Sequence, residues 1–141
     1  MILLKFPLHP ALVHFPIALF ISAIFFEILS LIFKKIDLHK TAWHIYIFAV
    51  LFTPLAVLSG LKEADRLDLH HPVLTLHKNF ALLSLGAGIF SFLVCLLLKK
   101  KFPPHFRPIF LIFLIVIVVA IVCTAYNGGR LVYDYGAGSE P

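Results

Sequence analysis

The chain has 141 residues, of which 61% are hydrophobic and 13% are charged, and its formal net charge is +5. A water-soluble domain of this length needs far more polar surface to cover its core, so the composition excludes a soluble globular protein. The length allows one domain and leaves no room for a separate catalytic module, and nothing in the charge pattern indicates nucleic-acid binding.

Four stretches are almost free of charge, namely residues 6–33 (apart from Glu27), 41–61, 79–98 and 108–129. Each has the roughly 20 residues that cross about 30 Å of hydrocarbon. Backbone groups in lipid must bond within their own segment, so these stretches must be α-helices. We therefore predict an all-α membrane protein, a four-helix transmembrane bundle in one domain over 1–141, with helices at about residues 10–33, 41–61, 72–98 and 106–126. Because the first stretch has no basic run before it and no cleavage site after it, we expect it to remain as a membrane helix.

The first helix opens with His9-Pro10-Ala-Leu-Val-His14. Pro10 suits the first position of a helix, and Pro16 should bend the helix beside His14. An imidazole about one turn inside a membrane is costly unless something binds it. Further along, Glu27 is an ionisable group at membrane depth and therefore a candidate for function.

The second helix carries His44 one turn from its start, on the same side of the membrane as Glu27. We expect the two to pair, either as a proton relay or quinone contact, or as a plain interhelical hydrogen bond. Glu27 snorkelling to the interface is a further alternative. We expect His39 and His105, in the inner turns, to be solvated.

The third helix repeats the opening phrase of the first, as His71-Pro72-Val-Leu-Thr-Leu-His77. Two neutral imidazoles at matching depth, such as His14 and His77, can supply both axial ligands of a haem iron. No Cys-x-x-Cys-His occurs, so such a haem is non-covalent haem b. The structural alternative is that each imidazole bonds a freed backbone carbonyl.

The fourth helix is expected to end at the double glycine Gly128-Gly129 and to lead into a polar tail. His9 and the turn at Gly129 would shape the mouth of the pocket, and Arg130 would meet a haem propionate. Other cations expected at this rim are Lys62, Arg66 and Lys78. The recurrence of His-Pro phrases and glycine-ended hairpins hints at a parallel duplication.

The loops set the orientation. Seven basic residues flank one side of the predicted bundle, namely Lys34, Lys35, Lys40, Lys99, Lys100, Lys101 and Arg107. The other side carries five, diluted by acidic residues: Lys5, Lys62, Arg66, Lys78 and Arg130. By the positive-inside rule, we place both termini and the 62–78 loop outside, which in a bacterial inner membrane is the periplasm.

A second hypothesis is a non-haem metal site formed by imidazoles and carboxylates near the outer ends of the helices. These residues are His9, His70, His71, Glu63, Asp65 and Asp68. Such ligands suit zinc, iron or manganese, although their spacing matches no tight metal signature. Solvated loop residues are the plainer interpretation.

Residues 8–19 read Leu-His-Pro-Ala-Leu-Val-His-Phe-Pro-Ile-Ala-Leu, and residues 128–138 read Gly-Gly-Arg-Leu-Val-Tyr-Asp-Tyr-Gly-Ala-Gly. With Glu27, Gly60-Leu61 and His77 between them, these motifs resemble a bacterial four-helix membrane family, the domain of unknown function DUF2231. Similar domains occur joined to Rieske iron–sulfur or c-type cytochrome modules, so the resemblance implies a place in membrane electron transfer. This chain carries no such module, so we expect its redox partner to be a separate protein.

The leading hypothesis is a small cytochrome with haem b between His14 and His77, an electron-transfer protein rather than a self-contained enzyme. It would pass electrons between the quinone pool and a periplasmic redox protein. One alternative is a metal-binding or transport protein that uses the outer cluster. Another is a cofactor-free subunit of a respiratory complex. The small residues of the third helix leave both homo- and hetero-oligomers open.

Overall fold

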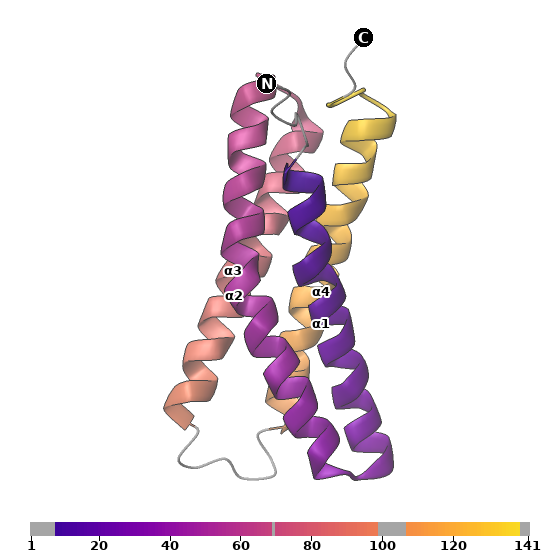
Figure 1. Cartoon of the computed structure of the whole chain (residues 1–141), viewed down its shortest axis with the longest axis vertical. Helices are drawn as coiled ribbons and strands as arrows, with labels where there is room; N and C mark the ends of the chain where they lie inside the picture. Colours follow the sequence, from indigo (N-terminus) through magenta and orange to yellow (C-terminus); the bar gives the residue numbers. More distant parts are fainter. Residues whose placement is uncertain (1–7, 69, 99–106, 139–141) are drawn as a thin grey trace, which may run out of the picture.

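The structure is a computed structural model that describes residues 8–68, 70–98 and 107–138, and every regular element within them is a helix. The helices are α1 (Leu8–Phe33), α2 (Ile36–Leu67), α3 (Pro72–Leu98) and α4 (Arg107–Tyr133). They run alternately up and down, so that α1 and α3 begin, and α2 and α4 end, at the same end of the bundle (Figure 1). We call this the histidine end, after His9, His14 and His77, and we call the opposite end the glutamate end, after Glu27.

All four helices are long and apolar enough to cross a membrane. Their outer faces carry large apolar side chains that stay exposed, among them Phe25, Leu51, Leu93 and Val119. Lipid solvates such a surface, whereas water does not. The predicted all-α bundle of four transmembrane helices is confirmed, and the chain is a multi-pass membrane protein.

The bundle is built from two hairpins. α1 packs along α2 and α3 along α4, and the hairpins then meet through α1 with α4 and through α2 with α3. The main core holds Phe20, Ala23, Tyr46, Ala49, Val50, Cys95, Phe110, Leu114, Ile117 and Ile121. Tyr46 links the hairpins, because its hydroxyl donates to the Gly88 carbonyl of α3 at 2.9 Å.

A smaller apolar cluster closes the histidine end. Ala64, Val73, Leu74 and Leu131 are buried together, and Ala137 packs against them. The segment after α4 therefore folds back over the ends of the other helices. The two clusters flank a cavity, which is lined by Ile121 of the main core and Leu74 of the smaller cluster.

The turns between helices are tighter than the sequence suggested. α2 begins at Ile36 rather than near Thr41, because a single left-handed residue, Lys34 with φ 53°, reverses the chain. Its other end runs on to Leu67 rather than Leu61, where Asp68 takes the left-handed conformation with φ 48°.

The double glycine does not end α4. The helix continues through Gly128 and Gly129 to Tyr133, where an end near Tyr126 was expected. A glycine inside a helix costs only about 1 kcal/mol relative to alanine. Burial of Asn127 and Leu131 on the helix face favours the longer helix. The expected inner turn with Lys99–Lys101 and His105 lies outside the described residues.

Candidate functional site

A cavity of about 430 Å³ lies at the histidine end and is lined by residues from all four helices. Small-molecule and cofactor sites typically measure about 300–1,000 Å³ and have mostly apolar walls. Aliphatic side chains and glycines form most of this lining. Its polar members are His9, His14, Thr53, His77, Lys78, Ser84, Thr124 and Tyr133.

His77 reaches the cavity from the second turn of α3. Its Nδ1 lies 2.8 Å from the carbonyl oxygen of Thr124 on α4. A carbonyl oxygen only accepts, so the Nδ1–H donates this hydrogen bond. In the neutral ring, Nε2 then keeps its lone pair, which is the form that binds a metal.

His9 is held in the same tautomer from the first turn of α1. Its Nδ1 lies 3.0 Å from the hydroxyl oxygen of Ser59 on α2. The Ser59 hydroxyl donates its own proton to the Ala56 carbonyl at 2.7 Å, so Ser59 Oγ accepts from His9. The lone pair again remains on Nε2. His9 therefore sits inside the site rather than only at its mouth.

His14 also lines the cavity but is more exposed. Its Nδ1 bonds the carbonyl oxygen of Pro10, one turn earlier in its own helix. Backbone carbonyls thus accept from both His14 and His77. Each bond uses Nδ1, however, and leaves Nε2 with its lone pair.

Two imidazoles of the cavity, those of His9 and His77, are in ring contact. Their ring centroids are 6.2 Å apart, and their planes stand at 87°. The sequence had paired His77 with His14. The structure places all three imidazoles around one cavity and brings His9, from the other helix hairpin, into ring contact with His77.

Two glycines make room for these rings. A Cβ on Gly60 would lie 2.6 Å from Cε1 of His9, and a Cβ on Gly128 would lie 3.1 Å from Cε1 of His77. Gly129 lines the cavity, but a Cβ there would meet nothing within 4 Å. Each ring therefore packs on a glycine of the neighbouring helix, Gly60 of α2 or Gly128 of α4.

The predicted rim cations differ in what they face. Arg130 donates to Asp134 at 3.2 Å and to the Tyr135 hydroxyl at 3.3 Å, both on the segment that follows it. Arg66 pairs with Glu63 at 2.6 Å. Lys78 lines the cavity itself. Of these predicted propionate partners, Lys78 is thus the one whose position fits best.

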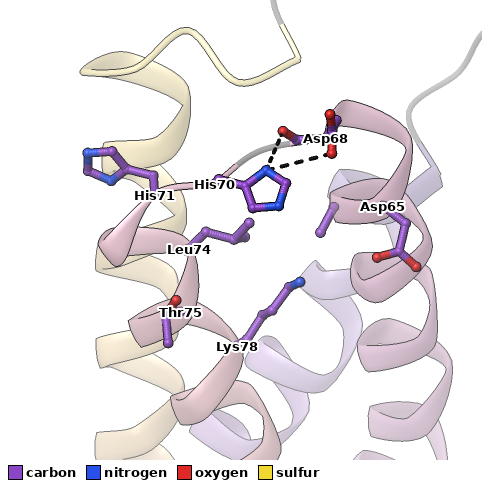
Figure 2. Close-up of a pocket in the computed structure, with 8 residues that line it drawn as sticks. Asp65, Asp68, His70, His71, Leu74, Thr75 and Lys78 are labelled. Carbon is purple, nitrogen blue, oxygen red and sulfur yellow. Dashed lines mark hydrogen bonds and ion pairs between the residues drawn. The ribbon is translucent and has the colours of Figure 1, made fainter.

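The outer histidines and carboxylates do not converge on one point. Only four of the six border a second hollow of about 340 Å³, namely Asp65, Asp68, His70 and His71. In that hollow His70 turns toward Asp68, while His71 and Asp65 point away (Figure 2). His9 instead lines the larger cavity, and Glu63 pairs with Arg66. His71 Nδ1 accepts from the Val73 backbone N–H at 3.2 Å and so caps α3. Within residues 8–68, 70–98 and 107–138, no three His, Cys, Asp or Glu side chains are grouped to hold a metal ion.

The glutamate end holds a buried ionic network. Glu27 is fully buried, with one carboxylate oxygen 2.6 Å from Nδ1 of His39 and the other 3.4 Å from Nε of Arg107. Arg107 also donates to Ser30 at 2.5 Å. The network ties together α1, α2 and α4.

The sequence predicted the wrong partner for Glu27. His44 is exposed and bonds the Lys40 carbonyl of its own helix at 2.7 Å, whereas His39, expected to be solvated, is 13% exposed. The difference arises because α2 begins before His39 and so fixes its direction. The signal was the helical spacing of His39 with Ala42, Trp43 and Tyr46, which extends the inward face to His39.

A search of curated proteins found no match, and neither did a search of solved structures. A family model described as "Predicted membrane protein (DUF2231)" matches residues 5–141. This match covers almost the whole chain and agrees with the resemblance of its opening and closing motifs. The chain belongs to the DUF2231 family of membrane proteins.

Proposed function

We propose that this protein is a b-type cytochrome of the bacterial inner membrane that binds one haem in the cavity at the histidine end. The observation that carries the proposal is the tautomer shared by His9, His14 and His77. Each ring commits Nδ1 to an acceptor, and each Nε2 lies without a hydrogen-bond partner among the described residues. Imidazoles whose Nδ1–H is held in this way are suited to metal ligation through Nε2.

The residues fit haem better than a free metal ion. A structural zinc site needs three or four protein ligands, whereas the porphyrin supplies four of the six ligands of haem iron and leaves two to the protein. The cavity offers pairs of imidazoles, and no three-ligand group exists in the described part of the chain. The apolar walls suit a flat macrocycle, and Lys78 would balance a propionate.

When bound, haem would supply one-electron transfer. The protein would provide the ligands of the iron and determine which molecules can approach the haem. Ser59 and Thr124 orient His9 and His77 through their Nδ1–H groups. Pro10 and His14 are exposed cavity residues, as is Tyr133, so a redox partner can approach this end closely. We assign the donor and acceptor to the quinone pool and to a separate redox protein.

The proposed orientation puts the histidine end in the periplasm. It rests on the excess of basic residues in the two short loops of the opposite side. The partner protein would then be periplasmic, and quinone would reach the haem from the bilayer.

The test is an optical spectrum of detergent-purified protein from haem-replete cells, before and after dithionite. We expect a Soret band, sharp reduced α and β bands, and about one haem per chain. The matched control replaces His9, His14 and His77 together with alanine and should be colourless. A folded wild-type protein without haem, or a triple variant with full haem content, would overturn the proposal.

The electron-transfer assignment needs a second measurement. Haem in vesicle-reconstituted protein should be reduced by an added dihydroquinone. Failure of the dihydroquinone to reduce a haem that dithionite does reduce would contradict the quinone assignment while leaving haem binding intact.

A further inference from the structure

We infer that His9 and His77, rather than His14 and His77, would hold the haem iron, with their imidazole planes close to perpendicular as they are in this structure. This inference rests on the proposed haem function and names the ligands of that site. Three features of the cavity support it. They are the spacing of the two rings, the hydrogen bonds of their Nδ1 atoms, and the glycine on which each ring packs.

The spacing of the two rings matches ligation of one metal ion from opposite sides. Metal–imidazole bonds measure about 2 Å, and the ring centre lies roughly 1 Å beyond the bound nitrogen. Two rings on opposite sides of one ion therefore have centroids about 6 Å apart. The centroids of His9 and His77 are 6.2 Å apart. This pair therefore meets the spacing requirement.

The hydrogen bonds made by Nδ1 of His9 and of His77 are also alike. A ligating histidine usually donates its other N–H to a fixed acceptor, which sets the direction of its ring. His9 donates to Ser59 of α2, and His77 donates to Thr124 of α4, so each ring is held by the neighbouring helix of its hairpin. His14 instead donates to Pro10 of its own helix and lies at an exposed position.

The glycines that the two rings pack on lie on the same neighbouring helices as their hydrogen-bond partners. The ring of His9 packs on Gly60 of α2, and the ring of His77 packs on Gly128 of α4. A side chain at either glycine would push the ring from its place. The two hairpins thus present equivalent His–Gly pairs, and all four of these residues line the same cavity.

The angle of 87° between the rings has a spectroscopic consequence. The π orbitals of an axial imidazole interact with the iron d orbitals in one plane. Parallel rings therefore separate the iron dxz and dyz orbitals, and perpendicular rings leave them nearly equal in energy. A ferric haem with perpendicular ligands gives a strongly anisotropic low-spin EPR signal dominated by one large g value, whereas parallel ligands give three resolved g values.

The experiment compares the single variants His9→Ala, His77→Ala and His14→Ala of the full chain by haem content and EPR. We expect the large-g signal in wild type, its loss in His9→Ala and His77→Ala, and its full retention in His14→Ala. Added imidazole should restore a low-spin signal to His9→Ala, which shows that the variant remains folded. Ser59→Ala should keep haem but change the g values.

Two outcomes would overturn the inference while sparing the proposed function. One is a wild-type haem whose low-spin signal is lost in His14→Ala and kept in His9→Ala. The other is a signal with three resolved g values, as parallel rings give. A wild-type protein that binds no haem would overturn both proposals.

Discussion

At the scale of single residues, hydrogen-bond partners separate histidines that look alike in the sequence. The repeated His-Pro phrase makes His9 and His71 equivalent, and their rings nevertheless take opposite roles. Nδ1 of His9 donates to Ser59, whereas Nδ1 of His71 accepts from the Val73 N–H, which puts the His71 proton on Nε2. His71 in this tautomer has no lone pair to offer a metal.

Replacing His71 with alanine should therefore affect stability but not haem. Loss of a helix-capping acceptor typically costs about 1 kcal/mol. We expect a small drop in Tm and an unchanged haem content in His71→Ala. Loss of haem in this variant, with the fold intact, would show that the outer histidines take part in the site.

The network at the glutamate end makes a second prediction at the residue scale. Removing one partner of a buried ion pair leaves the other charge uncompensated and typically costs 3–5 kcal/mol. Arg107 is 19% exposed, so we expect the low end, about 3 kcal/mol, for Glu27→Leu. The measurement is the midpoint of denaturation in detergent.

His44→Ala is the matched control for that prediction, because His44 is exposed and bonds the Lys40 carbonyl of its own helix at 2.7 Å. It should leave stability nearly unchanged. If His44→Ala destabilised the protein as much as Glu27→Leu, the network would not be what ties α1, α2 and α4 together.

Among the helices, α4 allows the effect of a side-chain contact to be compared with the effect of helix propensity, because its two adjacent glycines differ in their contacts. A Cβ at position 128 would meet the His77 ring at 3.1 Å, whereas one at position 129 would meet nothing within 4 Å. Alanine favours a helix over glycine by about 1 kcal/mol. Gly129→Ala should therefore stabilise the protein without moving the His77 ring.

Gly128→Ala should instead disturb the ring of His77 and shift the haem spectrum or lower the haem content. The comparison of these adjacent variants by optical titration with haem isolates the contact, because both make the same change in one helix. Equal spectra for the two variants would contradict the role given to Gly128.

The sequence supports the existence of the helices better than their ends. Charge-free stretches of sufficient length predicted all four spans correctly. The ends depended on tertiary features that no local pattern carries, such as the left-handed turn at Lys34 and the burial of Leu131 beyond the double glycine. Because the start of α2 was predicted too late, His39 was expected in a loop, and its hydrogen bond to Glu27 was not predicted.

The residue types that line the cavity and the end of the bundle where it lies were predictable from the sequence, but the ring contact of His9 with His77 was not. His9, His14, His77 and Gly129 all line the cavity. Matching depth alone favoured His14 as the partner of His77, because depth does not say which way a ring points. The direction of the His9 ring is set by its hydrogen bond to Ser59 on α2, and no sequence pattern singles out Ser59.

At the scale of the whole molecule, orientation in the membrane decides which compartment the cavity serves. The basic residues near the glutamate end predict that this end is cytoplasmic. In a variant without Cys95 and Cys123, His70→Cys should react with a membrane-impermeant maleimide added to intact cells. Asp37→Cys should react only after lysis, and the reverse pattern would place the cavity on the cytoplasmic side.

The bundle as a whole brings one His–Gly pair from each hairpin to a single apolar cavity. We propose that this cavity binds haem. The most direct measurement is the reduced-minus-oxidised optical spectrum of the purified protein from haem-replete cells. Sharp α and β bands with about one haem per chain are the expected result. A folded, colourless protein that also fails to take up added haem would contradict the account.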